Sequence, residues 1–326
     1  MAAASDSRAH AGALPVAETA ALTRNATRLS VIVALILVLA KAAAWLASGS
    51  IAMLASLVDS GMDVLASGAT FLAVRYAVSP PDREHRYGHG KAEAFASLVQ
   101  AGLVFASAAL LGEEAIRHLI RPRPIESTGW ALAVMVLSIA MTFALITAQT
   151  RMLRKASSVA VSGDRSHYLA DLASNVAALI GIGLAALLGS PRWDAAAGLI
   201  VGGVLLWGAV QVFKDSSGQL MDHELPDSER AEILARMTSD PRVRGVHQLR
   251  TRASGPYVHI QMHADLDPRL SLEQAHAVVV AAENRVLEAF PAADIIIHPD
   301  PQDRAEPHGG AFAESDRHDE ASAEPG

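Results

Sequence analysis

The sequence predicts a polytopic α-helical membrane protein with six transmembrane helices, followed by a small C-terminal α/β domain on the cytoplasmic side. Apolar residues make up 51% of the 326 residues and charged residues only 19%, and the mean hydropathy is +0.25. These values exclude a single water-soluble domain. After Lys214 the hydropathy falls and the periodicity changes, so a soluble part follows the membrane part.

Six apolar segments are each long enough to cross about 30 Å of hydrocarbon. They cover residues 27–48, 53–77, 93–119, 128–150, 158–188 and 194–213. The fifth segment is the longest, which is expected if its first turns, around Asp164 and Ser166, lie outside the hydrocarbon. Residues 1–26 lack the basic stretch and unbroken apolar core of a signal peptide, so we expect a cytoplasmic N-terminal tail.

Basic residues are distributed unequally between the two sides of the membrane. One side collects Arg24, Arg28, Arg75, Arg83, Arg86, Lys91, Arg151, Arg154, Lys155 and Lys214, and the other has Arg117, Arg121, Arg123 and Arg192. Cytoplasmic loops of membrane proteins are enriched in Lys and Arg. The bias of ten to four, like the even number of segments, places both termini in the cytoplasm.

Residues 215–302 show the pattern of a small α/β domain. We expect helices at 227–239 and 270–290 and strands at 245–252, 257–266 and 294–297, with a turn at 254–256. Strand 257–266 alternates between apolar residues and the polar Tyr257, His259, Gln261, His263 and Asp265. The order αββαβ predicts an open-faced sandwich of about 80 residues, which is marginal alone and is expected to form a homodimer.

The rest of the composition excludes other classes of protein. Residues 303–326 hold seven acidic residues and two arginines and indicate a disordered acidic tail. The net charge of −7 gives no indication of a nucleic-acid partner. The chain has no cysteine, so its metal chemistry must rest on carboxylates and on its 13 histidines.

Two short patterns inside apolar segments predict a metal site within the membrane. Asp59 and Asp63 lie four residues apart, as do His167 and Asp171, so each pair shares one helix face. A carboxylate at mid-membrane costs roughly 2.5–3.5 kcal/mol on insertion scales, and no Lys or Arg lies near the middle of either segment. Three oxygens and one imidazole suit a divalent cation of the zinc type. The structural alternative is that these carboxylates are hydrogen-bonded for packing alone.

Further motifs, in order along the chain, resemble the cation diffusion facilitator family in its bacterial branch of zinc and ferrous-iron efflux proteins. They are Gly49-Ser50-Ile51-Ala52, the loop His85-Arg-Tyr-Gly-His89-Gly-Lys91-Ala-Glu93, Leu220-Met-Asp222-His-Glu224-Leu-Pro226-Asp227, and His298-Pro-Asp300-Pro. With the Asp59/Asp63 and His167/Asp171 pairs, the resemblance covers about residues 27–302 and leaves only the two tails outside.

The resemblance implies three metal sites and one charge pair. A transport site is implied for Asp59, Asp63, His167 and Asp171, and a second site for Asp82, His85 and His89 in the cytoplasmic loop. A third site, holding two ions near the dimer contact, is implied for His247, His263, His276, His298 and Asp300. Lys91 and Asp222 resemble a charge pair that ties the membrane and soluble domains together between subunits. The matched pattern does not use His259, which we expect to be exposed.

The expected function is transport and not an enzymatic reaction. We expect a proton-coupled antiporter of the bacterial inner membrane that exports divalent metals from cytoplasm to periplasm. The main expected substrate is Zn²⁺, and Cd²⁺ and Fe²⁺ are further expected substrates. We also expect zinc to be bound as a structural ion. His167 is the expected coupling residue because an imidazole titrates near neutral pH. An ATP-driven pump or a membrane enzyme is disfavoured, since the sequence has no phosphate loop, phosphorylated-Asp motif or HExxH helix. A passive divalent-metal channel gated by a metal-sensing soluble domain stays open as the alternative.

Overall fold

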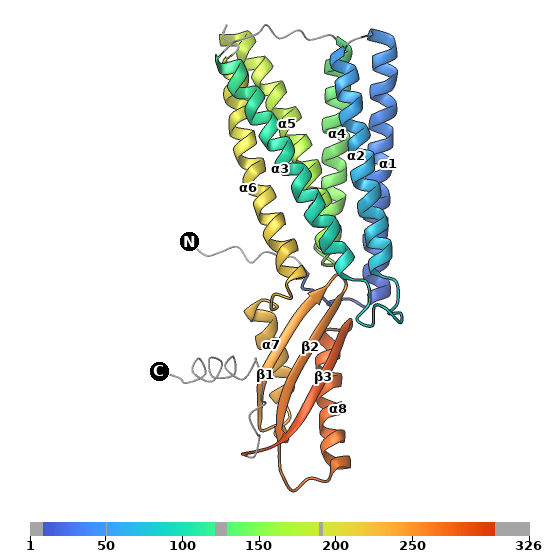
Figure 1. Cartoon of the computed structure of the whole chain (residues 1–326), viewed down its shortest axis with the longest axis vertical. Helices are drawn as coiled ribbons and strands as arrows, with labels where there is room; N and C mark the ends of the chain where they lie inside the picture. Colours follow the sequence, from blue (N-terminus) through green and yellow to red (C-terminus); the bar gives the residue numbers. More distant parts are fainter. Residues whose placement is uncertain (1–8, 50, 121–128, 189–191, 304–326) are drawn as a thin grey trace.

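The computed structural model describes residues 9–49, 51–120, 129–188 and 192–303. Its membrane part consists of six long helices: α1 (Val16–Ser48), α2 (Ile51–Ala77), α3 (Lys91–Ile120), α4 (Gly129–Leu153), α5 (Val159–Leu188) and α6 (Arg192–Leu220). They run along the long axis of the molecule, and the soluble domain lies at one end of the bundle (Figure 1). The predicted acidic tail, apart from Asp303, and the predicted outer-side residues Arg121 and Arg123 lie outside the described residues.

The prediction of six membrane helices followed by a small α/β domain is confirmed. Within the described residues, five of the six helices are long and apolar enough to cross a membrane. The remaining helix, α5, is equally long but carries Asp164, Arg165 and Asp171 in its first half. Asp171 is part of the predicted metal site.

The two ends of α1 follow from its local sequence. Proline has a fixed φ and no N–H, so it precedes a helix readily, and α1 begins directly after Pro15. At the other end Gly49 adopts a φ of 62°, and its N–H donates to the carbonyl of Trp45 at 2.8 Å. The helix starts well before the predicted residue 27, because Leu22 and Ala26 pack against Met152 of α4.

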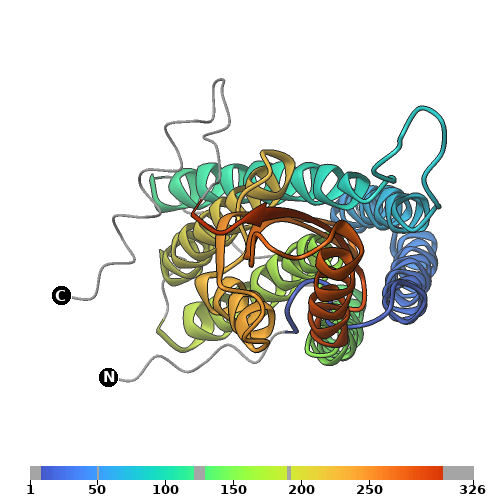
Figure 2. The same ribbon diagram turned by 90° about the horizontal axis from the view of Figure 1, so that it is seen from below.

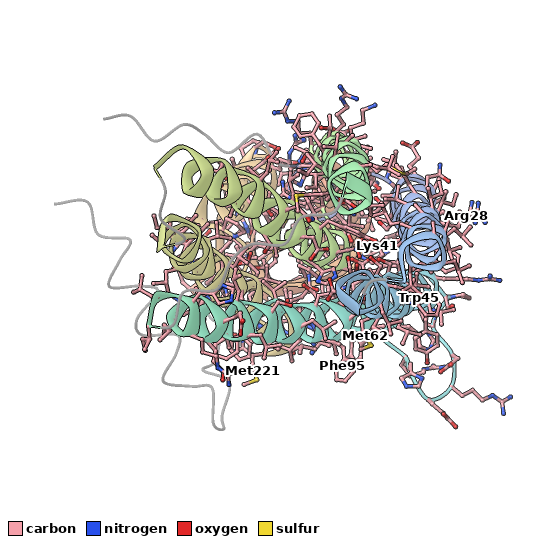
Figure 3. The ribbon with its side chains drawn as sticks, turned by 90° about the horizontal axis from the view of Figure 1, so that it is seen from above. Arg28, Lys41, Trp45, Met62, Phe95 and Met221 are labelled. Atoms are coloured by element: carbon pink, nitrogen blue, oxygen red, sulfur yellow. The ribbon has the colours of Figure 1, made fainter. Side chains whose placement is uncertain are left out.

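The helix α5 occupies the centre of the bundle. It contacts each of the other five membrane helices. In the side view and the view from above, α1, α2 and α4 lie together on one side of α5, and α6 lies on the other side (Figures 1 and 3). The polar residues of α5 therefore face protein on most sides.

The soluble domain has the predicted order αββαβ. Its elements are α7 (Asp227–Thr238), β1 (Gly245–Ser254), β2 (Tyr257–Leu266), α8 (Leu272–Ala289) and β3 (Ala293–Pro301). The sheet order is β1-β2-β3, with β1 and β2 antiparallel and β2 and β3 parallel. Helices α7 and α8 cover one face of the sheet, which leaves the other face free for polar side chains (Figure 2).

The core of this domain forms between the sheet and the two helices. The alternate residues Val258, Ile260, Met262, Ala264 and Leu266 of β2 are all at most 3% exposed, which confirms the predicted apolar face. They pack against buried residues of α7 and α8, including Ile233, Met237, Val278, Ala282 and Val286. Strand β3 is longer than the predicted 294–297, because it pairs with β2 from Ala293 to Pro301. Pro299 fits in this strand because β3 lies at an edge of the sheet.

A group of ion pairs joins the membrane part to the soluble domain. Lys91, the first residue of α3, contacts Asp222 with its Nζ 2.9 Å from Oδ1, and Arg252 of β1 contacts Oδ2 of Asp222 at 3.0 Å. Partial burial tends to raise the pKa of Asp222. The hydrogen bond from Lys91 and the charge of Arg252 outweigh this and hold the pKa below its usual value. The resemblance implied that Lys91 and Asp222 pair between subunits, whereas the structure closes this pair within one chain.

Two glycines allow the backbones of the two domains to touch at this junction. A Cβ on Gly90, in the loop before α3, would lie 2.0 Å from the carbonyl oxygen of Ser254. Gly255, in the turn between β1 and β2, has a φ of +57°, and a Cβ there would lie 2.7 Å from the carbonyl oxygen of Gly90. A glycine at the first turn position with positive φ suits a tight hairpin.

We therefore predict that Gly90→Ala loosens the junction. The added methyl group must displace backbone, which costs about 1–3 kcal/mol in tightly packed sites, and the melting temperature in detergent should fall. Gly218→Ala is the matched control, because its Cβ would make an ordinary contact 3.6 Å from Cβ of His223. Equal melting temperatures for the two variants would contradict the prediction.

Candidate metal centre

Three of the predicted ligands meet inside the bundle, where α2 faces α5. The imidazole Nε2 of His167 lies 3.0 Å from Oδ1 of Asp63 and 3.8 Å from Oδ2 of Asp171. Asp63 is 8% exposed and His167 is 6% exposed, so both are buried. One ligand atom from each of the three residues lies within 4.8 Å of the others, which is a distance range that a single metal ion can bridge.

The fourth predicted ligand, Asp59, stands one helical turn away from this group. It is exposed, and its carboxylate is not among the three that come within 4.8 Å of one another. Because Asp59 lies four residues before Asp63 on α2, it shares the face that meets α5. The structure thus brings three predicted ligands together and leaves Asp59 beside them.

A buried lysine next to this group was not recognised from the sequence. Lys41 of α1 is 9% exposed, and its Nζ donates to Oγ of Ser60 at 2.6 Å and to the carbonyl of Ser56 at 3.2 Å. Lys41 belongs to the first apolar segment, whereas the acidic pairs lie in the second and the fifth. A single Lys in the middle of an apolar segment was the signal that could have revealed it.

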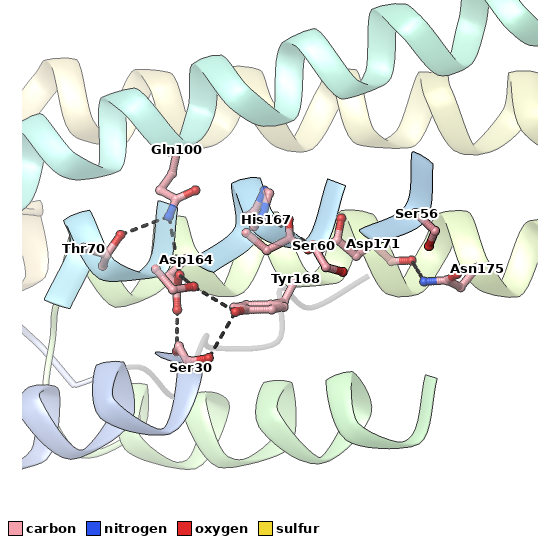
Figure 4. A network of polar contacts seen from close by, with 12 residues as sticks. Ser30, Ser56, Ser60, Thr70, Gln100, Asp164, His167, Tyr168, Asp171 and Asn175 are labelled. Carbon is pink, nitrogen blue, oxygen red and sulfur yellow. Dashed lines mark hydrogen bonds and ion pairs between the residues drawn. The ribbon is translucent and has the colours of Figure 1, made fainter. Parts of the chain in front are cut away.

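A second buried carboxylate, Asp164 of α5, is the hub of a polar network with residues of α1, α2, α3 and α4, part of which Figure 4 shows. Its Oδ2 accepts hydrogen bonds from Ser30 at 2.6 Å and Gln149 at 2.8 Å. Its Oδ1 accepts from Ser67 at 3.2 Å and Gln100 at 3.4 Å. The start of α5 was expected outside the hydrocarbon, and here Asp164 is 0% exposed and enclosed by protein.

The three residues of the predicted loop site lie close together. His85 Nδ1 lies 3.3 Å from Oδ1 of Asp82, and His89 Nε2 lies 3.2 Å from Oδ2 of the same carboxylate. The backbone N–H of His85 donates to Asp82, and this bond is the main reason why the pKa of Asp82 is lowered. His89 is buried against Tyr76, with ring centroids 4.4 Å apart, whereas Asp82 and His85 are exposed.

The residues of the predicted third site, apart from His276, lie on the polar face of the sheet. The register of the strands brings them together. His247 of β1, His263 of β2 and His298 of β3 are direct neighbours across the three strands. Asp300 joins them: its carboxylate lies 2.7 Å from Nδ1 of His263, and 3.4 Å from Nε2 of both His247 and His298. Asp265, which sequence reasoning did not include, lies 3.5 Å from His247.

His276 is the one predicted member of the third site that the chain does not bring to it. It is an exposed residue of α8. Helix α8 packs on the apolar face of the sheet through Val278, Ala282 and Val286, and the histidine cluster occupies the polar face. The αββαβ order could not reveal this separation, because it does not fix which residues of α8 face the sheet.

The prediction that His259 is exposed is wrong. His259 is 7% exposed, its Nδ1 lies 3.2 Å from Oδ2 of Asp294, and the ring of Tyr87 meets it edge-on at 5.7 Å. The alternating pattern correctly placed His259 on the polar face of β2, but the loop that carries Tyr87 covers this end of the strand. Burial, together with the charge of Arg252, lowers the pKa of His259.

Comparison with known proteins gives the same assignment over almost all of the described chain. Residues 27–221 match the family model described as "Cation efflux transmembrane domain", and residues 225–302 match "Cation efflux protein, cytoplasmic domain". The chain belongs to the cation efflux family. This is the cation diffusion facilitator family that the motifs resemble.

Relatives in this family share about two fifths of their residues with the chain. The cation-efflux pump FieF of Klebsiella pneumoniae is 41% identical over 265 residues, which are 81% of this chain and 88% of the relative. FieF of Citrobacter koseri is 41% identical over 86% of this chain and 93% of its own length. A solved structure of a candidate zinc transporter, CzrB in its Zn form, is 31% identical over 26% of this chain and 99% of its own, with a TM-score of 0.24.

We predict that acidification weakens the junction through His259. Because the folded state lowers the pKa of this imidazole, the unfolded chain takes up a proton first as the pH falls through about 6.5. The stabilising contribution of neutral His259 is therefore complete above that pH and declines toward the lower pKa of the folded state.

Melting temperatures of the wild type and of His259→Gln between about pH 8 and pH 5 test this effect. Glutamine retains a polar group but does not titrate, so the wild type should lose stability relative to the variant on acidification. Curves that stay parallel over the whole range would contradict the prediction.

Proposed function

We propose that this protein is a proton-coupled antiporter that exports divalent metal ions from the cytoplasm to the periplasm. Zn²⁺ is the main proposed substrate, with Cd²⁺ and Fe²⁺ as further substrates. The observation that carries the proposal is the group of Asp63, His167 and Asp171, buried between two helices of a cation efflux transmembrane domain. The FieF relatives, which are named cation-efflux pumps, support cation efflux.

The exchange of metal for protons follows from the chemistry of the ligands. A metal ion requires ionised carboxylates and a neutral imidazole, so metal and protons compete for one site. From the cytoplasmic side, metal binds and displaces protons; from the periplasmic side, protons displace the metal. His167 is the proposed coupling residue, because an imidazole changes its protonation near neutral pH and its Nε2 contacts Asp63 directly. Rocking of α2 and α5 around the site would expose it to each side in turn.

The other parts of the chain take supporting roles in this proposal. The transport domain comprises residues 27–214 and the metal-binding, dimerising domain residues 215–302, in a bacterial inner membrane with both termini in the cytoplasm. The cytoplasmic-domain match and the histidine cluster on the sheet support a homodimer that binds structural Zn²⁺. A bound zinc ion would join all three strands, because each strand supplies a member of the cluster.

Asp171→Ala is predicted to abolish zinc transport while the protein stays folded, because the change removes one of three converging ligands. Purified protein in liposomes, with a zinc indicator and a pH indicator inside, measures both fluxes. In the wild type, zinc entry should be accompanied by proton movement in the opposite direction. Glu113→Ala is the matched control, since Glu113 is an exposed carboxylate of α3 that pairs only with Arg117 among the contacts described.

Each outcome of this experiment has one meaning. Zinc flux that survives Asp171→Ala at nearly the wild-type rate would contradict the assigned site. Zinc flux in the wild type without any opposing proton flux would replace the antiporter with the passive, gated channel.

His167→Asp is predicted to shift metal preference from zinc toward Mn²⁺ or Fe²⁺. The change converts the site to carboxylates alone, which are harder ligands than imidazole. It also removes the group that titrates near neutral pH, so the pH dependence of transport should flatten. His118→Asp is the control, because His118 is the other histidine among the described residues of α1–α6. A variant with unchanged zinc preference and pH profile would show that His167 neither selects nor couples.

A further inference from the structure

Lys41 places a positive charge inside the bundle, next to the candidate metal centre. Its side chain points from α1 to α2, where Ser60 and Ser56 supply its two hydrogen bonds. Both partners are neutral oxygens, so they satisfy two of the three N–H groups of the ammonium but not its charge. Figure 3 labels Lys41 at the place where α1 meets α2. A buried ammonium in such a place requires acidic groups within electrostatic range.

The carboxylates of the metal centre are those acidic groups. Ser60, which accepts the 2.6 Å bond from Lys41, stands between Asp59 and Asp63 on α2. Lys41 interacts electrostatically with Asp59 and with Asp171. The ammonium therefore acts on the acidic groups from both α2 and α5.

The formal charges around the centre sum to a value that one divalent cation cancels. Asp59, Asp63 and Asp171 contribute −3, and Lys41 contributes +1, which leaves −2 when His167 is neutral. One M²⁺ ion brings this sum to zero. The remaining charged residues in this part of α5, Asp164 and Arg165, cancel each other formally.

We propose that Lys41 is a tethered counter-cation of the metal centre that limits metal affinity and speeds metal release. This inference rests on the proposed transport site. Without a metal ion, Lys41 offsets one of the three negative charges of Asp59, Asp63 and Asp171. When the ion binds, two cations share the same carboxylates, and their repulsion opposes tight binding. Without Lys41, the loaded site would keep a charge of −1 and would hold the ion more strongly.

The test measures zinc binding to the full chain in a background of His89→Ala and His263→Ala, which disables the loop and sheet groups. In this background Lys41→Met and Lys41→Gln remove the charge, and Lys41→Gln keeps a hydrogen-bond donor for Ser60. Both variants should bind zinc at least about tenfold more tightly and release it more slowly in stopped-flow chelator exchange. Lys41→Arg keeps the charge and should stay within about threefold of the parent.

The other outcomes overturn the proposal. Equal or weaker zinc binding by both neutral variants would show that the charge does not limit affinity. Wild-type binding by Lys41→Gln alone would assign the effect to the hydrogen bond with Ser60. If both neutral variants lost the folded state while Lys41→Arg kept it, Lys41 would be a structural residue. Asp171→Ala in the same background tests the site itself: zinc binding that survives this change would contradict the proposed transport site, and the role of Lys41 with it. If Asp171→Ala abolishes zinc binding and the neutral Lys41 variants do not bind more tightly, only the role of Lys41 is contradicted.

Discussion

The structure depends on one constraint, which is that every charge buried in the helical bundle must have partners. Asp164 has four hydrogen-bond donors, Asp63 has the imidazole of His167, and Lys41 has two oxygens of α2. A buried polar group without a partner costs a large part of its solvation free energy. Because the partners come from different helices, the same interactions that satisfy these charges also fix how the helices pack.

The helix α5 shows how the constraint determines both fold and site. Its first half carries Asp164, Arg165 and Asp171, and α5 contacts all five other membrane helices, which enclose its polar residues. The same residues present His167 and Asp171 to α2. Replacing Asp171 by an apolar residue would therefore remove one charge from the bundle and one predicted metal ligand at the same time.

Periodicity and motif spacing predicted the elements of the fold, the ligand pairs and the alternation of β2, because these depend on residues close together in the sequence. What they missed depends on contacts between distant segments. Lys41 meets the acidic residues through α1–α2 packing, and His259 is covered by a loop about 170 residues earlier in the chain. His276 lies apart from its predicted cluster because α8 covers the apolar face of the sheet. Asp265 lies beside His247 because of the register between β1 and β2. This register depends on strand pairing, which the sequence pattern does not specify.

The network around Asp164 has a mechanical consequence for α5. The carboxylate of Asp164, in the first turns of α5, is hydrogen-bonded to residues of the four helices α1–α4. A tilt of α5 that keeps these bonds must therefore pivot at Asp164, like a lever on a fixed fulcrum. With a rise of about 1.5 Å per residue, His167 and Asp171 lie roughly 5 and 10 Å along the arm. A small rotation would barely move His167 and would carry Asp171 about twice as far, which makes the geometry of the three ligands sensitive to the angle of a single helix.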